Sequence, residues 1–209
     1  MDGVIKYMPC DRAPGPDGFT GVFLKKCWSI IAEDFYKLAK DFHAGETGLA
    51  SINTSFITLV PKTSSLESES DYRPISLTNV CLKFLTKLVA NMLQNRILEC
   101  LNKNQYGFLR GRTIQDCIAW TLEYLHLCHT SKKPVIILKL DFEKAFDTIE
   151  HEAIIKILQC KGFDHIFITW VKELLSSGTS QVLLNGVPDR KSTRLNSSHS
   201  GESRMPSSA

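Results

Sequence analysis

Residues 134–147 read PVIILKLDFEKAFD, and this stretch decides both the fold class and the chemistry to be expected. Its first seven residues form a mostly apolar run, which predicts a buried central strand over 134–140. Asp141 follows at the carboxyl end of that strand, where the chain leaves the sheet and a ligand can approach. An ionised carboxylate is costly to bury there unless a cation compensates its charge. Mg²⁺ provides this compensation through oxygen ligands, and two such ions can align a hydroxyl with a phosphate.

Two other interpretations of these carboxylates stay open at this point. In the simpler one, Asp141 caps the next helix and Asp147 lies in a solvated turn. In the other, Asp141, Glu143 and Asp147 serve an unrelated metal-dependent nuclease or phosphatase. A single strand-end aspartate favours the simpler interpretation, so the decision depends on the segments around it.

Outward from this stretch, helical and strand patterns mix without strict alternation, which predicts the α+β class. Apolar residues at helical spacing run from Phe19 to Phe42, and Gly45 ends the run. Helices are also predicted over 80–101, from a capping box at Thr113 to about His129, over 150–160 and over 164–176. Strands are predicted over 55–60, ended by Pro61, and over 181–185, with a polar hairpin-like loop over 63–70.

Composition excludes several classes of protein. The chain has 209 residues, 43% hydrophobic and 22% charged, which rules out a wholly disordered or collagen-like chain. The net charge of +3 gives no strong overall attraction to nucleic acid, so a binder must cluster its basic residues. No apolar run is long enough for a membrane span and no signal peptide is visible, so we expect an intracellular protein of cytoplasm or nucleus. Seven cysteines without a Cys-x-x-Cys pair predict reduced, buried thiols.

The last 21 residues differ from the rest of the chain. Residues 189–209 read DRKSTRLNSSHSGESRMPSSA, which contains too few apolar residues to repay the entropy of ordering. The two ends of this stretch, 189–199 and 203–209, resemble one translated sequencing adaptor in a single frame. We therefore expect a disordered, adaptor-like scar and exclude these residues from the fold.

Five blocks in consistent order resemble the reverse transcriptase domain of a non-LTR (LINE-type) retrotransposon, especially the plant kind. They are RAPGPDGF (12–19), FITLVPK (56–62), DYRPISL (71–77), QYGFLRGRTI (105–114) and DFEKAFD (141–147). The resemblance covers nearly all of residues 12–188. It implies the fingers and an incomplete palm of a right-hand polymerase.

The resemblance also implies roles for individual residues. Lys62 and Arg73 would clamp the phosphates of an incoming deoxynucleoside triphosphate, with the Arg73 fork contacting two oxygens. Asp141 would bind both Mg²⁺ ions, and the Phe142 carbonyl would add a ligand. Phe146 would exclude a ribose 2′-hydroxyl by steric rejection. Considered singly, these are equally a surface lysine, a structural arginine and a core phenylalanine.

A basic-aromatic cluster would contact the template backbone and stack a base; its members are Tyr106, Phe108, Arg110 and Arg112. Packing and solvated surface explain half of that cluster equally well. Asp147 has no firm role: it orients nearby backbone or caps the helix beginning near Glu150.

The resemblance implies an RNA template, a DNA primer and deoxynucleotides as partners, and no membrane. The corresponding regions are an N-terminal block and helix (1–48), a fingers-like region (49–133) and the first part of the palm (134–188). The family's second palm motif and its Asp-Asp turn are absent from the sequence, so we expect this chain to be an inactive fragment of an RNA-directed DNA polymerase. The alternative is a catalytically inert RNA-contacting remnant, or a relic of the element.

Overall fold

The structure is a computed structural model that describes residues 1–62, 64–65, 68, 71–142, 148–189 and 193–194. The chain divides into two compact units: residues 1–89 together with 150–209, and residues 90–149. The second unit is therefore an insertion between the two segments of the first. No helix in the described ranges is long and apolar enough to cross a membrane.

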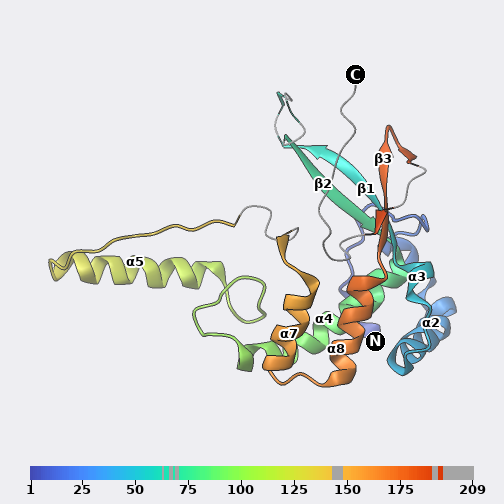
Figure 1. The fold of residues 1–209 in the computed structure, drawn as a ribbon, viewed down its shortest axis with the longest axis horizontal. Helices are drawn as coiled ribbons and strands as arrows, with labels where there is room; N and C mark the ends of the chain where they lie inside the picture. Colours follow the sequence, from blue (N-terminus) through green and yellow to red (C-terminus); the bar gives the residue numbers. More distant parts are fainter. Residues whose placement is uncertain (63, 66–67, 69–70, 143–147, 190–192, 195–209) are drawn as a thin grey trace. The chain divides into compact units, whose positions relative to one another are not determined.

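Helices and a mixed sheet together confirm the α+β class (Figure 1). The helices are α1 (Asp2–Lys6), α2 (Gly21–Ala44), α3 (Leu49–Ile52), α4 (Val80–Cys100), α5 (Ile114–Thr130), α7 (His151–Cys160) and α8 (His165–Ser176). The strands are β1 (Thr54–Pro61), β2 (Tyr72–Thr78), β3 (Thr179–Leu184), β4 (Val187–Pro188) and β5 (Thr193–Arg194).

The sheet belongs to the first unit and has the order β2-β1-β3-β4, with β5 also paired to β3. Strands β1 and β2 form an antiparallel hairpin whose register runs from Ser55↔Thr78 to Pro61↔Tyr72. On its other edge β1 pairs in parallel with β3, and this pairing ends at Ile57↔Val182. The outer half of β1 therefore pairs with β2 alone among the described strands.

Helix boundaries follow the capping signals in the sequence. Helix α2 begins after Thr20, whose side chain accepts a hydrogen bond from the Phe23 backbone, and it ends at Gly45 with φ of 77°. Such a left-handed terminal residue favours glycine, which pays no Cβ penalty. Helix α5 begins with the predicted capping box between Thr113 and Asp116. The helices predicted over these regions are confirmed.

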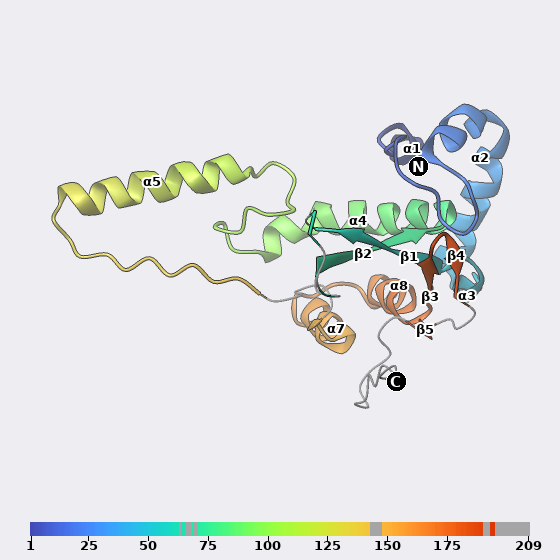
Figure 2. The same ribbon diagram turned by 90° about the horizontal axis from the view of Figure 1, so that it is seen from above.

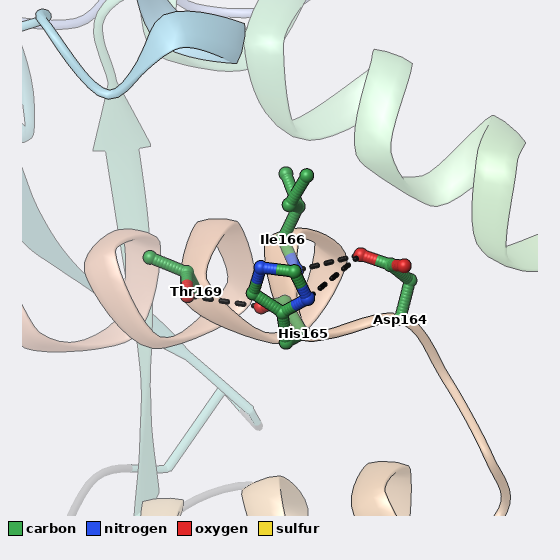
Figure 3. A network of polar contacts seen from close by, with 4 residues as sticks. All are labelled: Asp164, His165, Ile166 and Thr169. Atoms are coloured by element: carbon green, nitrogen blue, oxygen red, sulfur yellow. Dashed lines mark hydrogen bonds and ion pairs between the residues drawn. The ribbon is translucent and has the colours of Figure 1, made fainter.

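Helices α7 and α8 confirm the last two predicted helices, with Gly162 at a φ of 72° between them. At the start of α8, Asp164 accepts a hydrogen bond of 2.8 Å from the Ile166 backbone N–H (Figure 3). The same carboxylate lies 3.6 Å from Nδ1 of His165, and the Thr169 hydroxyl donates to the His165 carbonyl. The bond from Ile166 satisfies a backbone N–H of the first turn, which otherwise lacks a helical partner.

The core of the first unit is aromatic and aliphatic. Phe84 of α4 is fully buried and meets Phe35 of α2 edge-to-face, with ring centroids 5.1 Å apart. Trp28 lies 6.2 Å from the same Phe84 ring, and Phe42 packs on Trp170 of α8 at 5.8 Å. This packing fixes α2, α4 and α8 as the layer that supports the sheet residues.

The prediction of a buried central strand over 134–140 is wrong. This segment is extended but forms no strand, and Ile136 is 96% exposed while Leu138 is 76% exposed. It follows α5 as a long unpaired trace (Figure 2). A strand needs hydrogen-bond partners, and this segment pairs with none of the described strands β1 to β5. The described residues of 90–149 contain no strand with which this segment could pair.

Two further expectations differ from the structure in part. Within 189–209 the structure describes Asp189 and the short strand β5, so Thr193 and Arg194 are paired where disorder was expected. None of the seven cysteines, all of which lie in the described ranges, forms a disulfide; only Cys128 is classed as buried, and Cys10 and Cys160 are exposed. Sequence context placed these thiols among apolar neighbours without revealing which face of each element they occupy.

Candidate functional site

Lys62 and Arg73 come together at the open end of the β1–β2 hairpin. Arg73 pairs with Val60, and the Lys62 backbone N–H continues the ladder by donating to the Asp71 carbonyl at 2.7 Å. Since side chains alternate along a strand, Val60, Lys62 and Arg73 lie on one face of the hairpin. Diagonal neighbours of this kind have side chains within reach of one another. The register thus puts Lys62 and Arg73 at diagonal positions on one face of the hairpin.

The outer half of this hairpin is exposed on both faces. Leu59 and Ile75 are 45% and 43% exposed, and Arg73 is also exposed. Because Thr58–Pro61 extends beyond the β3 pairing, this part is a two-stranded ribbon. A two-stranded ribbon is marginally stable by itself, so a ligand held by Lys62 and Arg73 would add to its order.

Asp71, at the start of the strand that returns from the hairpin loop, is bonded to Ser68. Its carboxylate accepts hydrogen bonds from the backbone N–H of Ser68 at 2.8 Å and from the Ser68 hydroxyl at 3.2 Å. The Asp71 backbone N–H in turn donates to the Ser68 carbonyl. The residues between Ser68 and Asp71 lie outside the described residues.

Asp17 anchors the base of the hairpin, where β2 ends and α4 begins. No role was predicted for this carboxylate from the sequence. Its carboxylate accepts a hydrogen bond from the Val80 backbone N–H at 2.6 Å, and from the Phe19 N–H at 3.2 Å. The Asp17 N–H donates to Oδ1 of Asn79. Asn79 then donates through its amide to the Ile52 carbonyl, 27 residues earlier in the chain. The 13–18 turn is therefore fastened to the junction between β2 and α4.

Gly15 is a position of that turn at which glycine is required. A Cβ atom at this position would lie 2.3 Å from the Thr78 carbonyl oxygen at the end of β2. Only glycine allows this approach. The Pro-Gly-Pro-Asp-Gly pattern was a visible signal of a rigid turn, whereas its contact with a strand end sixty residues away was not.

The other end of β1 is fixed by buried polar groups. Asn53 donates through its amide to the Leu174 carbonyl and to the Ser177 hydroxyl, each at 2.8 Å. The Ser55 and Ser180 hydroxyls lie 2.7 Å apart across the parallel strand pair. Buried polar groups that are fully bonded specify one register, because any slip leaves them unsatisfied.

In the second unit, the predicted template-contact residues hold their own loop together. Arg110 donates from Nη2 to Oδ1 of Asn91 at 2.5 Å, and its backbone N–H donates to Gln94. Arg112 donates from Nη1 to the carbonyls of Asn102 and Gln105, both at 2.7 Å. These contacts give the two arginines a structural role that the basic-aromatic pattern alone did not reveal.

The aromatic members of this loop differ in exposure. Tyr106 is half-buried, whereas Phe108 is 89% exposed and has a φ of 63°. Gln94 donates to the Phe108 carbonyl at 2.8 Å, which holds the loop in this conformation. An exposed aromatic ring on an anchored loop suits stacking with a nucleobase.

Asp141 and Phe142 lie at the end of the exposed segment that follows α5. Both are exposed, and Phe142 reaches 82%. Phe146, Asp147 and Glu143 lie outside the described residues. A carboxylate and a backbone carbonyl are oxygen donors of the type that Mg²⁺ prefers. However, no group of three His, Cys, Asp or Glu side chains gathers among the residues that the structure describes.

Three groups away from these residues have shifted pKa values. Hydrogen bonds from Tyr36 and Trp28 lower the pKa of Asp2, and the Asp2 carboxylate raises the pKa of Tyr36. These bonds fasten α1 to α2. Burial raises the pKa of Cys81, and the neighbouring negative charge of Asp17 adds to the effect.

Comparison with known proteins gives the family of the chain. The family model described as reverse transcriptase (RNA-dependent DNA polymerase) matches residues 60–204, more than half of the chain. That range includes residues 189–204 of the stretch excluded from the fold. Over 186 residues the chain is 30% identical to the uncharacterized 149 kDa protein of transposon TX1 from Xenopus laevis, an alignment covering 88% of the chain and 14% of that protein.

Pol polyproteins of retrotransposable elements are also related to the chain. It is 27% identical to that of the type-1 element R2 from Popillia japonica, over 81% of the chain and 23% of the relative. It is 28% identical to that of the type-2 element R2DM from Drosophila melanogaster, over 83% of the chain and 16% of the relative. The chain spans less than a quarter of the length of these proteins. The motifs, the α+β fold and these relatives agree: the chain belongs to the reverse transcriptase family, within the group of non-LTR retrotransposon proteins.

Proposed function

We propose that this chain is part of an RNA-directed DNA polymerase of a retrotransposon, and that the β1–β2 hairpin holds the incoming deoxynucleoside triphosphate. The observation that carries the proposal is the placement of Lys62 and Arg73 on one face of the hairpin. A planar guanidinium contacts two phosphate oxygens at once, and an ammonium group adds a compact second charge. RNA template, DNA primer and deoxynucleotides are then the partners, inside the cell in cytoplasm or nucleus.

In the longer protein, we propose Asp141 as one carboxylate ligand of two Mg²⁺ ions, with the Phe142 carbonyl as a further ligand. The donor types support this assignment. When bound, such ions supply the positive charge that aligns a primer hydroxyl with the phosphate. We propose that the template contacts Tyr106, Arg110 and Arg112. The hydrogen bonds that both arginines make within the protein fix the conformation of their loop.

The hairpin proposal is tested in the longer retrotransposon protein that contains this chain. Arg73→Gln removes a charge-assisted fork, so kcat/KM for deoxynucleotide is expected to fall by about 10- to 100-fold, mainly through KM. Lys62→Gln is expected to act in the same direction with a smaller effect. The control is Lys40→Gln on α2, an exposed lysine that carries the same charge change. Steady-state primer extension measures both constants, and equal values for Arg73→Gln and the control would reject the proposal.

Phe146 is proposed to exclude the 2′-hydroxyl of ribonucleotides by steric contact, as the motif implies. Phe146→Val makes room for that hydroxyl, so incorporation of ribonucleotides relative to deoxynucleotides is expected to rise. The ratio is measured with each nucleotide type on the same primed template. An unchanged ratio in a variant that still extends deoxynucleotides would reduce Phe146 to a packing residue.

A second candidate is an RNA-contacting remnant without catalysis. The observation that favours it is the unpaired, exposed segment before Asp141, together with the lack of a three-residue metal-ligand cluster among the described residues. The two candidates are separated by sequencing the transcript that encodes this chain. An intact frame encoding an Asp-Asp turn supports the polymerase, whereas stops or frameshifts support the remnant.

A further inference from the structure

A small pocket of about 190 Å³ lies within the first unit, where the segment after α1 meets the start of α4. Figure 2 shows the N-terminal segment beside this end of α4. Three of its lining side chains are cationic, namely Arg12, Lys83 and Lys87. The remaining lining residues are apolar, aromatic or glycine, and include Tyr7 and Val80. No carboxylate lines the pocket.

The charges in this pocket are not balanced within the described part of the protein. Lys83 and Lys87 are four residues apart on α4, so they occupy the same face and repel each other. Lys83 donates to the Ala13 carbonyl at 3.3 Å, a neutral partner that leaves its charge in place. Neither lysine nor Arg12 has an ion pair among the described residues. An anion held in the pocket would offset this repulsion.

The carboxylate at the start of α4 does not fill this role. Asp17 borders the pocket through Val80, but its carboxylate is bound to the backbone N–H groups of Val80 and Phe19. These bonds direct the Asp17 carboxylate oxygens to the N-terminal end of α4. The first amide of the helix is thus already capped, so the attraction for an anion comes from the three side chains.

We propose that this pocket binds a backbone phosphate of a nucleic-acid strand. Pockets that enclose whole small molecules usually measure about 300–1,000 Å³, so this one suits a single phosphate group with part of its sugar. Tyr7, 77% exposed at the pocket, offers an aromatic surface on which a neighbouring base can stack. The nature of the strand rests on the proposed polymerase function. The contact is distinct from the Lys62–Arg73 pair and from the loop of Arg110.

The test measures binding of the full 209-residue chain to a fluorescent single-stranded RNA by anisotropy at several salt concentrations. In the pocket variant, Arg12, Lys83 and Lys87 are each changed to Gln. Each phosphate contact contributes about 0.7 to the slope of log affinity against log salt, so the slope is expected to fall by at least ~0.7 and the affinity by ~10-fold at low salt. The control changes the exposed Lys37, Lys40 and Lys156 to Gln, with the same loss of charge.

Two further measurements make the result decisive. A variant with Lys83→Arg and Lys87→Arg keeps the charge and is expected to retain RNA affinity, while circular dichroism checks that every variant folds. Inorganic tripolyphosphate is titrated as the alternative source of phosphate, and it is expected to displace RNA only at far higher concentration. Equal losses in the pocket and control variants would overturn the proposal, as would pocket-dependent tripolyphosphate binding with unaffected RNA binding. Since no polymerisation is measured, this outcome is independent of the Arg73 experiment.

Discussion

Asp17 illustrates how a single carboxylate fixes distant parts of the first unit. It caps the first amide of α4 and orders the turn at Phe19, while its own amide binds Asn79. Asn79 is 8% exposed and continues the chain of bonds to the Ile52 carbonyl and the Thr54 hydroxyl. The start of α4, the end of α3 and the start of β1 are thus joined through two side chains.

Removing this carboxylate is expected to destabilise the first unit. Asp17→Ala leaves the Val80 amide without its cap, which costs about 1–2 kcal/mol in the free energy of unfolding. It also removes one of the two causes that raise the pKa of Cys81, so that pKa is expected to fall toward its usual value. Urea denaturation measures the first effect, and the pH dependence of Cys81 alkylation measures the second.

Asp11→Ala is the matched control, since Asp11 is exposed in the same segment and, among the described residues, accepts no hydrogen bond from a backbone amide of α4. Its effect on stability is expected within about 0.5 kcal/mol. Equal stability of the two variants would show that the bonds of Asp17 contribute nothing net.

Among the elements, the segment over 134–142 departs most from the pattern of its sequence. Its apolar residues favour burial, yet Ile136, Leu138 and Leu140 are all at least 74% exposed. An apolar, extended and unpaired segment is a template for pairing with another chain. The exposed segment therefore predicts self-association of the isolated chain.

This association is expected to weaken when charge is introduced. The double variant Ile136→Lys and Leu138→Lys replaces two exposed side chains, so the free energy of unfolding should change by less than about 0.5 kcal/mol. The added charges should oppose pairing between chains, so the chain should stay monomeric up to a higher protein concentration. Sedimentation velocity and urea denaturation measure the two quantities. For comparison, Leu85→Ala removes a fully buried side chain and should cost about 2–5 kcal/mol. Unchanged association in the double variant would show that the chain self-associates through another surface.

Elements governed by local chemistry could be predicted from sequence, and those governed by distant partners could not. Two helices depend on contacts between residues close in the sequence, and both are confirmed. One was predicted from the apolar spacing between Phe19 and Phe42, and the other from the capping box at Thr113. The 134–140 run has strand composition, but whether it pairs depends on residues far along the chain. Likewise Lys62 and Arg73 were visible as candidates, whereas their common face depends on the register of β1 and β2.

At the scale of the whole molecule, the candidate residues are divided between the two units. Lys62 and Arg73 belong to the first unit, and Asp141 with Arg110 and Arg112 to the second. Phosphoryl transfer with two metal ions needs several carboxylates around them. Asp141 is a single carboxylate, and the described residues gather no further ligands into a group of three.

The 209-residue chain is therefore expected to extend no primer. Purified chain is mixed with a primed RNA template, Mg²⁺ and deoxynucleotides, and products are resolved by gel electrophoresis. The longer protein serves as the positive control, in which Asp141→Asn should abolish extension because it removes the charge that attracts the metals. Template-dependent product from the 209-residue chain, lost on Asp141→Asn, would show that this part of the family suffices for catalysis.

The parallel pairing of β1 with β3 has a consequence for the order of folding during synthesis. Ser55 and Ser180 meet across this pair although 125 residues separate them. Closing a loop of that length costs about 4 kcal/mol of chain entropy, and ribosomes add about 5–20 residues per second. The β1–β2 hairpin, complete at Thr78, can form early, but β3 begins at Thr179, 101 residues further along the chain. This second neighbour of β1 therefore emerges roughly 5–20 seconds later, after the whole inserted unit has been made. During that interval the edge of β1 that later pairs with β3 is open to chaperone binding or misassembly.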